Sequence, residues 1–304
     1  MPQSNQSGRT LEYAIVAVII SNHPKDKIEL SARLVNNQKK DQVSFLALPE
    51  KVRLQHMKYA SIVYQWLSDD FRISQKEIVL DRMSDVDAKY GDVTDIRITM
   101  DGSNLNLSVK HNHFALKHQR PSTTAIRCGF APKSKEDLEF RKDLGNITGA
   151  FIINSSKDYP DATLFNEIKS QSPTYINKNL YFPVCNLISG FINKYSDRIN
   201  VVTLFKFLVG DTDFYKVTAF KKQIVIEEFA RLQKPTSVTT RLKGDSYIIL
   251  NFSNGWDISL RLHTASSKIG KNPSLKFDTL LINSDMPSTV SYTHLRAHET
   301  VLDL

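Results

Sequence analysis

Cysteine is scarce in this sequence, and long apolar runs are missing. The 304 residues include only two cysteines, Cys128 and Cys185, and neither has a neighbouring motif that would activate its thiol. The longest apolar run, Ala14 to Ile20, falls well short of the roughly 20 residues that a membrane-spanning helix needs. It also lacks the basic leader and the cleavage site of a secretory signal. We therefore expect two structural thiols, no membrane segment and a cytoplasmic location.

Internal repeats, low-complexity tracts and Gly/Ser-rich linkers are also absent, so the sequence shows no domain boundary. Hydrophobic residues make up 41% of the chain, with 16 Phe and 11 Tyr, which excludes wholesale disorder. The formal net charge of +8 favours a polyanionic partner, although it would also serve solubility alone. These features predict one large domain over residues 1–290.

The last 14 residues, SYTHLRAHETVLDL, resemble the translated adapter sequence that occurs at the ends of metagenomic gene fragments. We therefore expect residues 291–304 to be a non-native tail without contacts to the fold. His294 and His298 are four residues apart, a spacing that would place both imidazoles on one helix face. Because they belong to this tail, we assign them no metal-binding role.

The apolar spacing predicts helices first and strands later. A helix is expected over Arg9 to Ser21, and helical spacing from Gln42 to Leu67 predicts a second helix that begins at Pro49. Alternation of apolar and polar residues from Val93 to Lys110 predicts a β-hairpin. Further core elements are expected near 151–154, 201–209 and 214–220, with a helix over 224–232 and a second hairpin, 247–252 with 256–262, whose type I′ turn is Asn254-Gly255. This order is typical of an elaborated α/β domain.

The turn of the first hairpin sets its register. If Asp101-Gly102 is a two-residue turn, Met100 pairs with Ser103. One face of the hairpin is then apolar, with Ile96 and Ile98 opposite Leu107 and Leu105. The other face is polar, with Thr99, Arg97 and Asp95 opposite Asn104, Asn106 and Ser108.

Asp95 and Lys110 converge on this polar face, because Lys110 lies two residues beyond Ser108 on the same side of its strand. A carboxylate and a lysine in this arrangement are suited to holding a divalent cation and activating water for phosphodiester hydrolysis. The alternative is a solvated hairpin face that carries the two charges without a function.

The segment that follows Lys110 is rich in groups that bind phosphates and base edges. It reads KHNHFALKHQRP, and the DNA-contacting residues that we expect in it are His111, Asn112, His113, Lys117, His118, Gln119 and Arg120. Its three histidines have no cysteines nearby and lack the spacing of a zinc site, so we do not predict zinc. Such a run beside Asp95 and Lys110 favours a DNA-cleaving site.

Two stretches, GDVTDIRI and LNLSVKHNHFALKHQRP, resemble the catalytic region of type II restriction endonucleases with the PD-(D/E)XK core. Within that group they are most similar to the HaeIII-type enzymes, which recognise GGCC. The stretches GRTLEYA, WDISLRLHTASSKI and LKFD add to the likeness, which spans most of residues 8 to 285. The resemblance implies a restriction-endonuclease-like mixed central sheet flanked by helices.

The resemblance also implies roles for individual residues. Asp95 matches the metal-binding aspartate, Lys110 matches the motif lysine, and Ser108 stands where the family has a second acid. Because a serine hydroxyl is a weak Mg²⁺ ligand, another carboxylate is expected to compensate. Glu12 is our first choice, since related cores often supply a glutamate from the first helix. Asp92 is the competitor, although its position also suits a turn residue that binds the local backbone.

A second group of candidate DNA contacts accompanies the C-terminal hairpin. Their side chains suit phosphate or guanine contacts, and the alternative is an ordinary solvated loop. The residues are Arg261, His263, Ser267 and Lys268.

The sequence and its resemblance therefore predict a Mg²⁺-dependent type II restriction endonuclease that cuts double-stranded DNA. The resemblance implies GGCC as the target and 5′-phosphate ends on the products. The expected partner is a cognate DNA methyltransferase in a restriction-modification system, and a palindromic target suits a homodimer. Two alternatives stay open. A DNA-binding protein whose site has decayed at Ser108 would bind without cleaving, and a structure-selective repair nuclease of the same core would give no fixed fragments.

Overall fold

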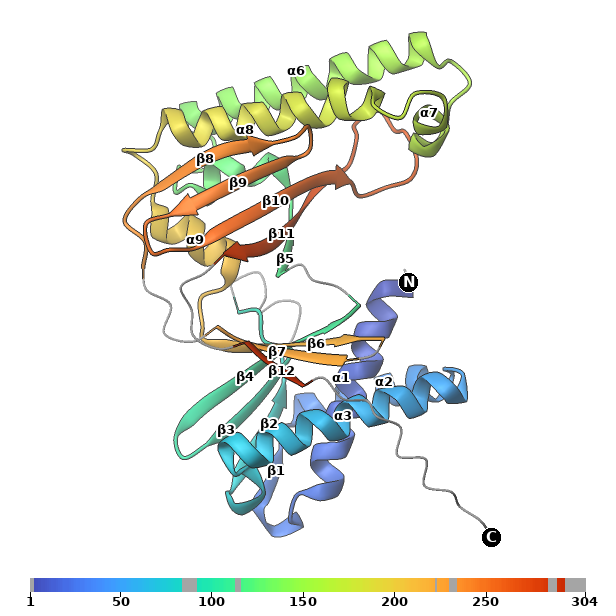
Figure 1. Ribbon diagram of the computed structural model, residues 1–304, viewed down its shortest axis with the longest axis vertical. Helices are drawn as coiled ribbons and strands as arrows, with labels where there is room; N and C mark the ends of the chain where they lie inside the picture. Colours follow the sequence, from blue (N-terminus) through green and yellow to red (C-terminus); the bar gives the residue numbers. More distant parts are fainter. Residues whose placement is uncertain are drawn as a thin grey trace. The chain divides into compact units, whose positions relative to one another are not determined.

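The computed structural model (Figure 1) describes residues 3–83, 92–112, 116–221, 223–229, 234–283 and 289–292. Its residues divide into two compact units. Unit 1 comprises Met1–Phe114, Asp211–Leu232 and Met286–Leu304, and unit 2 comprises Ala115–Gly210 and Gln233–Asp285. Because the chain passes between the units several times, no single linker separates them. We expected one domain over residues 1–290. The repeated passage of the chain between the units explains why the sequence shows no domain boundary.

A seven-stranded mixed sheet forms the centre of unit 1, in the strand order β1-β2-β3-β4-β6-β7-β12. Its neighbours are parallel at β1/β2 and at β4/β6 and antiparallel elsewhere, which confirms the expected mixed α/β sheet. The strands are β1 (Ile28–Leu30), β2 (Ile78–Arg82), β3 (Ile96–Met100), β4 (Ser103–His111), β6 (Phe214–Phe220), β7 (Gln223–Phe229) and β12 (Thr289–Tyr292).

Three helices, α1 (Gln3–Asn22), α2 (Ala32–Leu46) and α3 (Glu50–Phe71), pack with the apolar face of this sheet (Figure 1). The two helices expected before the first sheet are α1 and α3, and Pro49 directly precedes α3 as expected. The helix α2 was missed, although Ser31 caps it by accepting a hydrogen bond from the Leu34 amide. The strand β1 was missed because three residues are too few to show alternation.

The first hairpin has the register that its turn predicted. Met100 pairs with Ser103, and Ile96 pairs with Leu107. Asp101 and Gly102 both have positive φ, 50° and 73°, as a type I′ turn requires. The apolar face of the hairpin lies in the core, and the polar face is also covered in part, since Asn106 and Ser108 are buried. The polar face is therefore not simply a solvated surface.

The segment from Ile224 is a strand rather than the helix that we expected over 224–232. The strand β7 pairs with β6 along its whole length, from Phe220↔Gln223 to Phe214↔Phe229. Ile224 and Ile226 are buried while Val225 between them is partly exposed, which is the two-residue period of a strand. The sequence of this stretch contains too few apolar residues to distinguish the period of a strand from that of a helix.

The edge of the same sheet includes two residues of the expected tail. In β12, Ser291 pairs with Val225 and Tyr292 pairs with Ile224. The expectation that residues from Ser291 onward make no contact with the fold is therefore wrong for these two. A strand can add to an open sheet edge through its backbone alone, so such a contact is not visible in side-chain patterns. Residues 293–304, with His294 and His298, lie outside the described residues.

Unit 2 combines a five-stranded sheet, in the order β5-β11-β10-β9-β8, with helices on one of its faces (Figure 1). The expected core elements near 151–154 and 201–209 are parts of α6 and α9. The strands are β5 (Lys117–Gln119), β8 (Val238–Lys243), β9 (Tyr247–Phe252), β10 (Asp257–Thr264) and β11 (Leu275–Asn283), and the helices are α5 (Thr124–Arg127), α6 (Lys135–Asp158), α7 (Phe165–Gln171), α8 (Phe182–Lys194) and α9 (Val201–Val209).

The second expected hairpin is present as β9 and β10, but its turn differs from the prediction. Gly255 has a φ of 81°, whereas Asn254 is not in the positive-φ region. A type I′ turn needs positive φ at both central residues. The strands are instead joined by the four residues 253–256, closed by a hydrogen bond from the Phe252 amide to the Trp256 carbonyl.

Both cysteines are buried, unpaired thiols in unit 2, and burial raises the pKa of each to about 12. This supports their expected structural role, since a protonated thiol is a poor nucleophile. Among the described residues, no helix is long and apolar enough to cross a membrane.

His56 makes the stability of unit 1 sensitive to acid. Its imidazole is buried in α3 against His111 of β4, with ring centroids 5.2 Å apart. Burial, and then the nearby His111, lower the pKa of His56 from 6.5 to about 4. Between these values the unfolded chain binds a proton that the folded chain does not, so stability is lost as the pH falls from about 6.5 toward 4.

We predict that His56→Phe makes this acid dependence shallower, because the variant lacks one of the buried imidazoles that take up a proton on unfolding. Urea unfolding at several pH values between about 7.5 and 5 measures the slope of the unfolding free energy against pH. An equally steep slope in the variant and the parent protein would mean that other groups cause the acid sensitivity.

Candidate active site

Asp95 and Lys110 lie together at one end of the β3–β4 hairpin, as the register predicted. The Lys110 Nζ atom is 3.4 Å from Asp95 Oδ2. The same oxygen accepts hydrogen bonds from the Val109 amide at 2.6 Å and from the Ser108 hydroxyl at 3.4 Å. The backbone holds Asp95 on both sides, since its amide donates to the Leu107 carbonyl and its carbonyl accepts from the Met83 amide. The carboxylate is therefore fixed against β4.

Glu12 supplies a second carboxylate from α1. Its carboxyl group is largely buried, with 13% of the side chain exposed. Burial, followed by repulsion from Asp95, raises the pKa of Glu12 to about 7, while Arg82 and Lys110 act in the opposite direction. Asp95 and Lys110, which contact each other, both act on the Glu12 carboxyl group through their charges. Glu12, Asp95 and Lys110 therefore belong to one charged cluster.

Arg82, which is not among the residues expected in the site, binds Glu12 directly. Its Nη2 donates to Glu12 Oε2, while its Nη1 donates to Asp41 Oδ2 at 2.7 Å. Arg82 ends β2, Asp41 belongs to α2, and both residues are buried. Arginine is almost never fully buried unless its charge is paired. The two partners of Arg82 lie 70 and 41 residues away in sequence, so no local motif pointed to this group.

Asp92, the competing carboxylate, is bound elsewhere. Its Oδ2 accepts from Arg97 at 2.6 Å, and its Oδ1 accepts from the Thr94 amide at 3.0 Å. The second contact is that of a turn residue that binds its local backbone, which was the other reading of its position. Both oxygens of Asp92 are thus engaged, and this favours Glu12 as the second carboxylate.

Ser108 lies in a row of polar residues that crosses the sheet. It pairs with Lys216 of β6, and Lys216 pairs with Glu227 of β7. The Lys216 Nζ atom is 2.8 Å from Glu227 Oε2, and the lysine is only 4% exposed. A buried ammonium therefore lies on the strand next to Ser108, on the same face. This pair could not be predicted from the sequence, because its two residues become neighbours only through the pairing of β6 with β7.

The carboxylates of the cluster offer oxygen ligands to a hard divalent cation. Within the part of the chain that the structure describes, no three or more His, Cys, Asp or Glu side chains form a metal-binding group. The two carboxylates that interact most strongly in the cluster are those of Glu12 and Asp95. Such a set matches the way Mg²⁺ is commonly held in enzymes that cut phosphodiesters, by one or two carboxylates and oxygens of the substrate.

Comparison with known proteins decides the family. The family model described as HaeIII restriction endonuclease matches residues 8–230 and 221–287. The chain belongs to the HaeIII restriction endonuclease family. The type II restriction enzyme HaeIII of Haemophilus aegyptius is 28% identical over 246 residues, which cover 68% of this chain and 70% of that enzyme. No solved structure matches the chain. The resemblance read from the sequence is confirmed.

Membership of the HaeIII family makes the protein a type II site-specific deoxyribonuclease that acts on double-stranded DNA. The matched residues include the helix that carries Glu12 and the hairpin that carries Asp95 and Lys110.

The expected DNA-contacting run after Lys110 is divided between the two units. His111 lies in unit 1 on the apolar face, with its ring against His56, and the exposed Asn112 directly follows it with a positive φ of 53°. In unit 2, Gln119 is buried and donates to the Phe207 carbonyl, whereas Arg120 is exposed and binds Ser274 and Leu275. His111 and Gln119 thus have packing roles in this structure.

The remaining residues of that run are His113, Lys117 and His118. His113 lies outside the described residues. Lys117 and His118 belong to β5, where they pair with Thr279 and Asp278 of β11.

Four cations share one face of the unit 2 sheet, and this group, Arg241, Lys243, Arg261 and Lys276, is called the cationic face. The register places Lys243, Tyr247 and Arg261 in one row across β8, β9 and β10. Arg241 and Lys276 lie on the same face, because each is an even number of residues from a paired position. Arg241, Lys243 and Arg261 are exposed. Of these, only Arg261 is among the DNA-contacting residues expected from the sequence.

The helices of unit 2 cover the opposite face of that sheet. Ser189 of α8 hydrogen-bonds to Thr240, and Phe205 of α9 packs on Phe252. Thr240 and Phe252 lie on the face opposite the cationic face, because successive side chains of a strand point to opposite sides of the sheet.

The other residues expected near the second hairpin lie beside the cationic face. His263 follows Arg261 on the same face and bonds to Asp278 at 3.0 Å. Ser267 and Lys268 are exposed. The Ser267 carbonyl accepts a hydrogen bond from the Phe165 amide of α7, and Lys268 forms a β-bridge with Leu164. The restriction endonuclease therefore keeps Arg261, Ser267 and Lys268 accessible, while His263 is engaged by a carboxylate.

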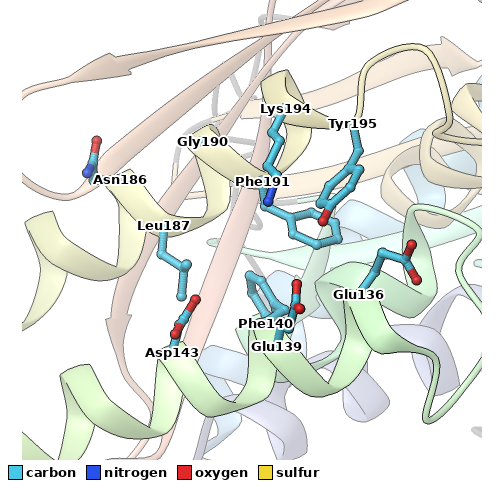
Figure 2. Close-up of a pocket in the computed structure, with 10 residues that line it drawn as sticks. All are labelled: Glu136, Glu139, Phe140, Asp143, Asn186, Leu187, Gly190, Phe191, Lys194 and Tyr195. Atoms are coloured by element: carbon cyan, nitrogen blue, oxygen red, sulfur yellow. The ribbon is translucent and has the colours of Figure 1, made fainter.

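A cavity of about 330 Å³ lies between α6 and α8 of unit 2 (Figure 2). Its lining includes three carboxylates of α6, from Glu136, Glu139 and Asp143, together with Lys194 of α8. None of the residues expected to bind DNA or metal lines it. We therefore assign this cavity no part in binding the DNA substrate.

Proposed function

We propose that this restriction endonuclease cuts double-stranded DNA in a Mg²⁺-dependent reaction at the site formed by Asp95, Lys110 and Glu12. The observation that carries the proposal is the convergence of two carboxylates and a lysine from α1, β3 and β4 in unit 1. These are the side-chain types that phosphodiester hydrolysis with a divalent cation requires.

Glu12 and Asp95 are the proposed ligands of the cation. The hydrogen bonds to the Asp95 carboxylate fall on its Oδ2, and Arg82 contacts Glu12 at Oε2. The mutual repulsion of the two carboxylates, which contributes to the raised pKa of Glu12, would be relieved by a cation between them. When bound, Mg²⁺ supplies electrophilic stabilisation of the phosphate and of the leaving oxygen.

Lys110 is proposed to act on the attacking water. Its ammonium is anchored by Asp95 and remains partly exposed, with 27% of the side chain accessible, so it can donate to a water or a phosphate oxygen and stabilise developing negative charge. The Ser108 hydroxyl helps to orient Asp95 and the water. In the reaction the water oxygen bonds to phosphorus, the P–O3′ bond breaks, and O3′ takes up a proton, which leaves a 5′-phosphate end.

The cationic face of unit 2 is proposed as a DNA contact surface, together with Arg120, Ser267 and Lys268. Its charges complement the phosphate backbone. Arginine on a sheet face also has the bidentate geometry that reads guanine. Asp257 and Asp278 share that face but are bound by Asn251 and His263, so their negative charges are partly offset.

The specificity and the partners belong to the same proposal. GGCC is the proposed target, because the resemblance of the catalytic stretches is greatest to enzymes that recognise it. A DNA methyltransferase that protects the same sequence would complete a restriction-modification system, and a two-fold dimer would match the symmetry of the target.

Plasmid digestion tests the activity and its residues together. The purified protein with Mg²⁺ is expected to give fixed fragments whose sequenced ends lie at GGCC. Asp95→Asn and Lys110→Ala are expected to reduce the single-turnover cleavage rate by about 10³-fold or more, because each removes a group that acts on the reacting phosphate or water. Thermal unfolding checks that each variant is folded.

Asp101→Asn is the matched control for Asp95→Asn, since it changes the same residue type at the other end of the same hairpin. Asparagine tolerates the positive φ of that turn, so cleavage should be unchanged. DNA binding without any cleavage by the parent protein would support a decayed site, and fragments without fixed ends would support a structure-selective nuclease. Full cleavage by either active-site variant would remove that residue from the site.

The choice between Glu12 and Asp92 is tested by the concentration of Mg²⁺ that cleavage needs. Glu12→Gln is expected to raise the half-maximal concentration about tenfold or more, because a ligand oxygen loses its charge. Asp92→Asn should leave it nearly unchanged, since Asp92 is occupied by Arg97 and Thr94. Single-turnover cleavage across a Mg²⁺ series gives both values. The reverse ranking would transfer the second carboxylate to Asp92.

The cationic face is tested by the double variant Arg241→Ala with Lys243→Ala. We expect it to weaken duplex binding in Ca²⁺ by about tenfold and to lower the slope of log affinity against log salt by up to about 2. The control is Lys142→Ala with Lys157→Ala, which removes the same charge from exposed positions on α6. Equal losses in the two double variants would show a general charge effect, and no loss in the first would exclude the face.

A further inference from the structure

We propose that Arg82 is a positioning residue that holds Glu12 toward the divalent cation, and that Asp41 anchors Arg82 from its other side. This inference rests on the proposed role of Glu12 as a metal ligand. It adds two residues, from β2 and α2, that bind neither the cation nor the DNA.

The guanidinium of Arg82 connects two helices instead of closing a pair with one carboxylate. A lone arginine–carboxylate pair is commonly bidentate, with both Nη or Nε groups on one carboxyl group. Here Nη2 binds Glu12 of α1 and Nη1 binds Asp41 of α2 at 2.7 Å. Gln38 of α2 adds a contact to Nη1 at 3.5 Å. Each partner thus receives one donor, and the arginine is held in place by two elements.

This arrangement occupies only one oxygen of Glu12. Arg82 contacts Oε2, while Oε1 lies beside Gly8, one helical turn earlier in α1, where a Cβ atom would be 3.9 Å away. Because Gly8 has no side chain, it leaves space beside Oε1. Arg82 therefore fixes one oxygen of the carboxylate, and Gly8 leaves room for a ligand beside the other.

The backbone relates Arg82 to the rest of the site. Arg82 pairs with Ile96, the residue after Asp95, and the following residue, Met83, donates to the Asp95 carbonyl at 3.1 Å. The arginine that holds Glu12 and the strand that carries Asp95 are consequently neighbours in one sheet. A change in the position of Arg82 would alter the separation of the two carboxylates.

Removal of Arg82 should change the affinity for a divalent cation in opposite directions, depending on whether the arginine positions Glu12 or acts only through its charge. Removing a cation from the neighbourhood of a metal site should strengthen binding of a divalent cation if Arg82 acts only through its field. Removing the group that orients a ligand should weaken it, commonly by 10- to 100-fold. The inference predicts the second result.

Calorimetric titration of the protein with Mn²⁺, without DNA, provides the test. Arg82→Met is expected to weaken Mn²⁺ binding about tenfold in the parent protein but to change it less than about twofold in the Glu12→Gln background. Arg82→Lys keeps the charge but cannot span both carboxylates, so it should also bind Mn²⁺ more weakly. Urea unfolding of each variant checks the fold.

Arg33→Met is the matched control, because Arg33 of α2 pairs with Asp81, the residue before Arg82 in β2. It removes a similar connection between the same two elements and should leave Mn²⁺ affinity unchanged. If Arg82→Met does not fold, Asp41→Asn replaces it in the same cycle, with the same non-additive loss expected.

Tighter Mn²⁺ binding by Arg82→Met, unchanged binding, or equal losses with and without Glu12 would each overturn the positioning role. Failure of the proposed function looks different. In that case Glu12→Gln itself would leave Mn²⁺ binding and the Mg²⁺ requirement of cleavage unchanged.

Discussion

The register of the β3–β4 hairpin is the constraint on which the active site depends. A two-residue turn at Asp101 and Gly102 fixes every pair in the hairpin, and a slip of one residue would exchange its apolar and polar faces. The apolar face is held in the core of unit 1, so such a slip would bury polar groups without partners. Asp95 and Lys110 therefore meet at the far end of the hairpin because packing and turn geometry require the same pairing.

Buried charge is the second feature that shapes unit 1. Glu12, Asp41 and Asp95 would repel one another in a medium that screens charge poorly. Arg82, which stays protonated at any pH of interest, binds two of them, and Lys110 binds the third. The buried carboxylates of this cluster keep some mutual repulsion in spite of these partners. Such unfavourable charge interactions are typical of functional sites.

The two units carry different kinds of residue. Unit 1 holds the carboxylates and the lysine suited to hydrolysis, whereas unit 2 presents exposed arginines and lysines on the sheet face opposite its helices. Phosphate contacts supply affinity without chemistry, and a cleavage site needs few residues in exact geometry. In the proposed function the enzyme separates these two demands, with a rigid charged cluster in one sheet and a broad cationic surface on the other.

Local features of the chain were predictable from its sequence. The turn, the alternation and the pairing of the first hairpin involve residues close together, so the sequence determined the meeting of Asp95 with Lys110, and α1 with Glu12 followed from helical spacing. The helix expected over 224–232 was wrong for residues 224–229, because strand β7 is defined by its pairing with β6. Only the tertiary structure decided the contacts of Arg82 with Glu12 and Asp41, the burial of Gln119 and the placement of His111 against His56. These contacts join residues 41 or more positions apart, and burial and long-range charge pairing leave no periodic trace in the chain.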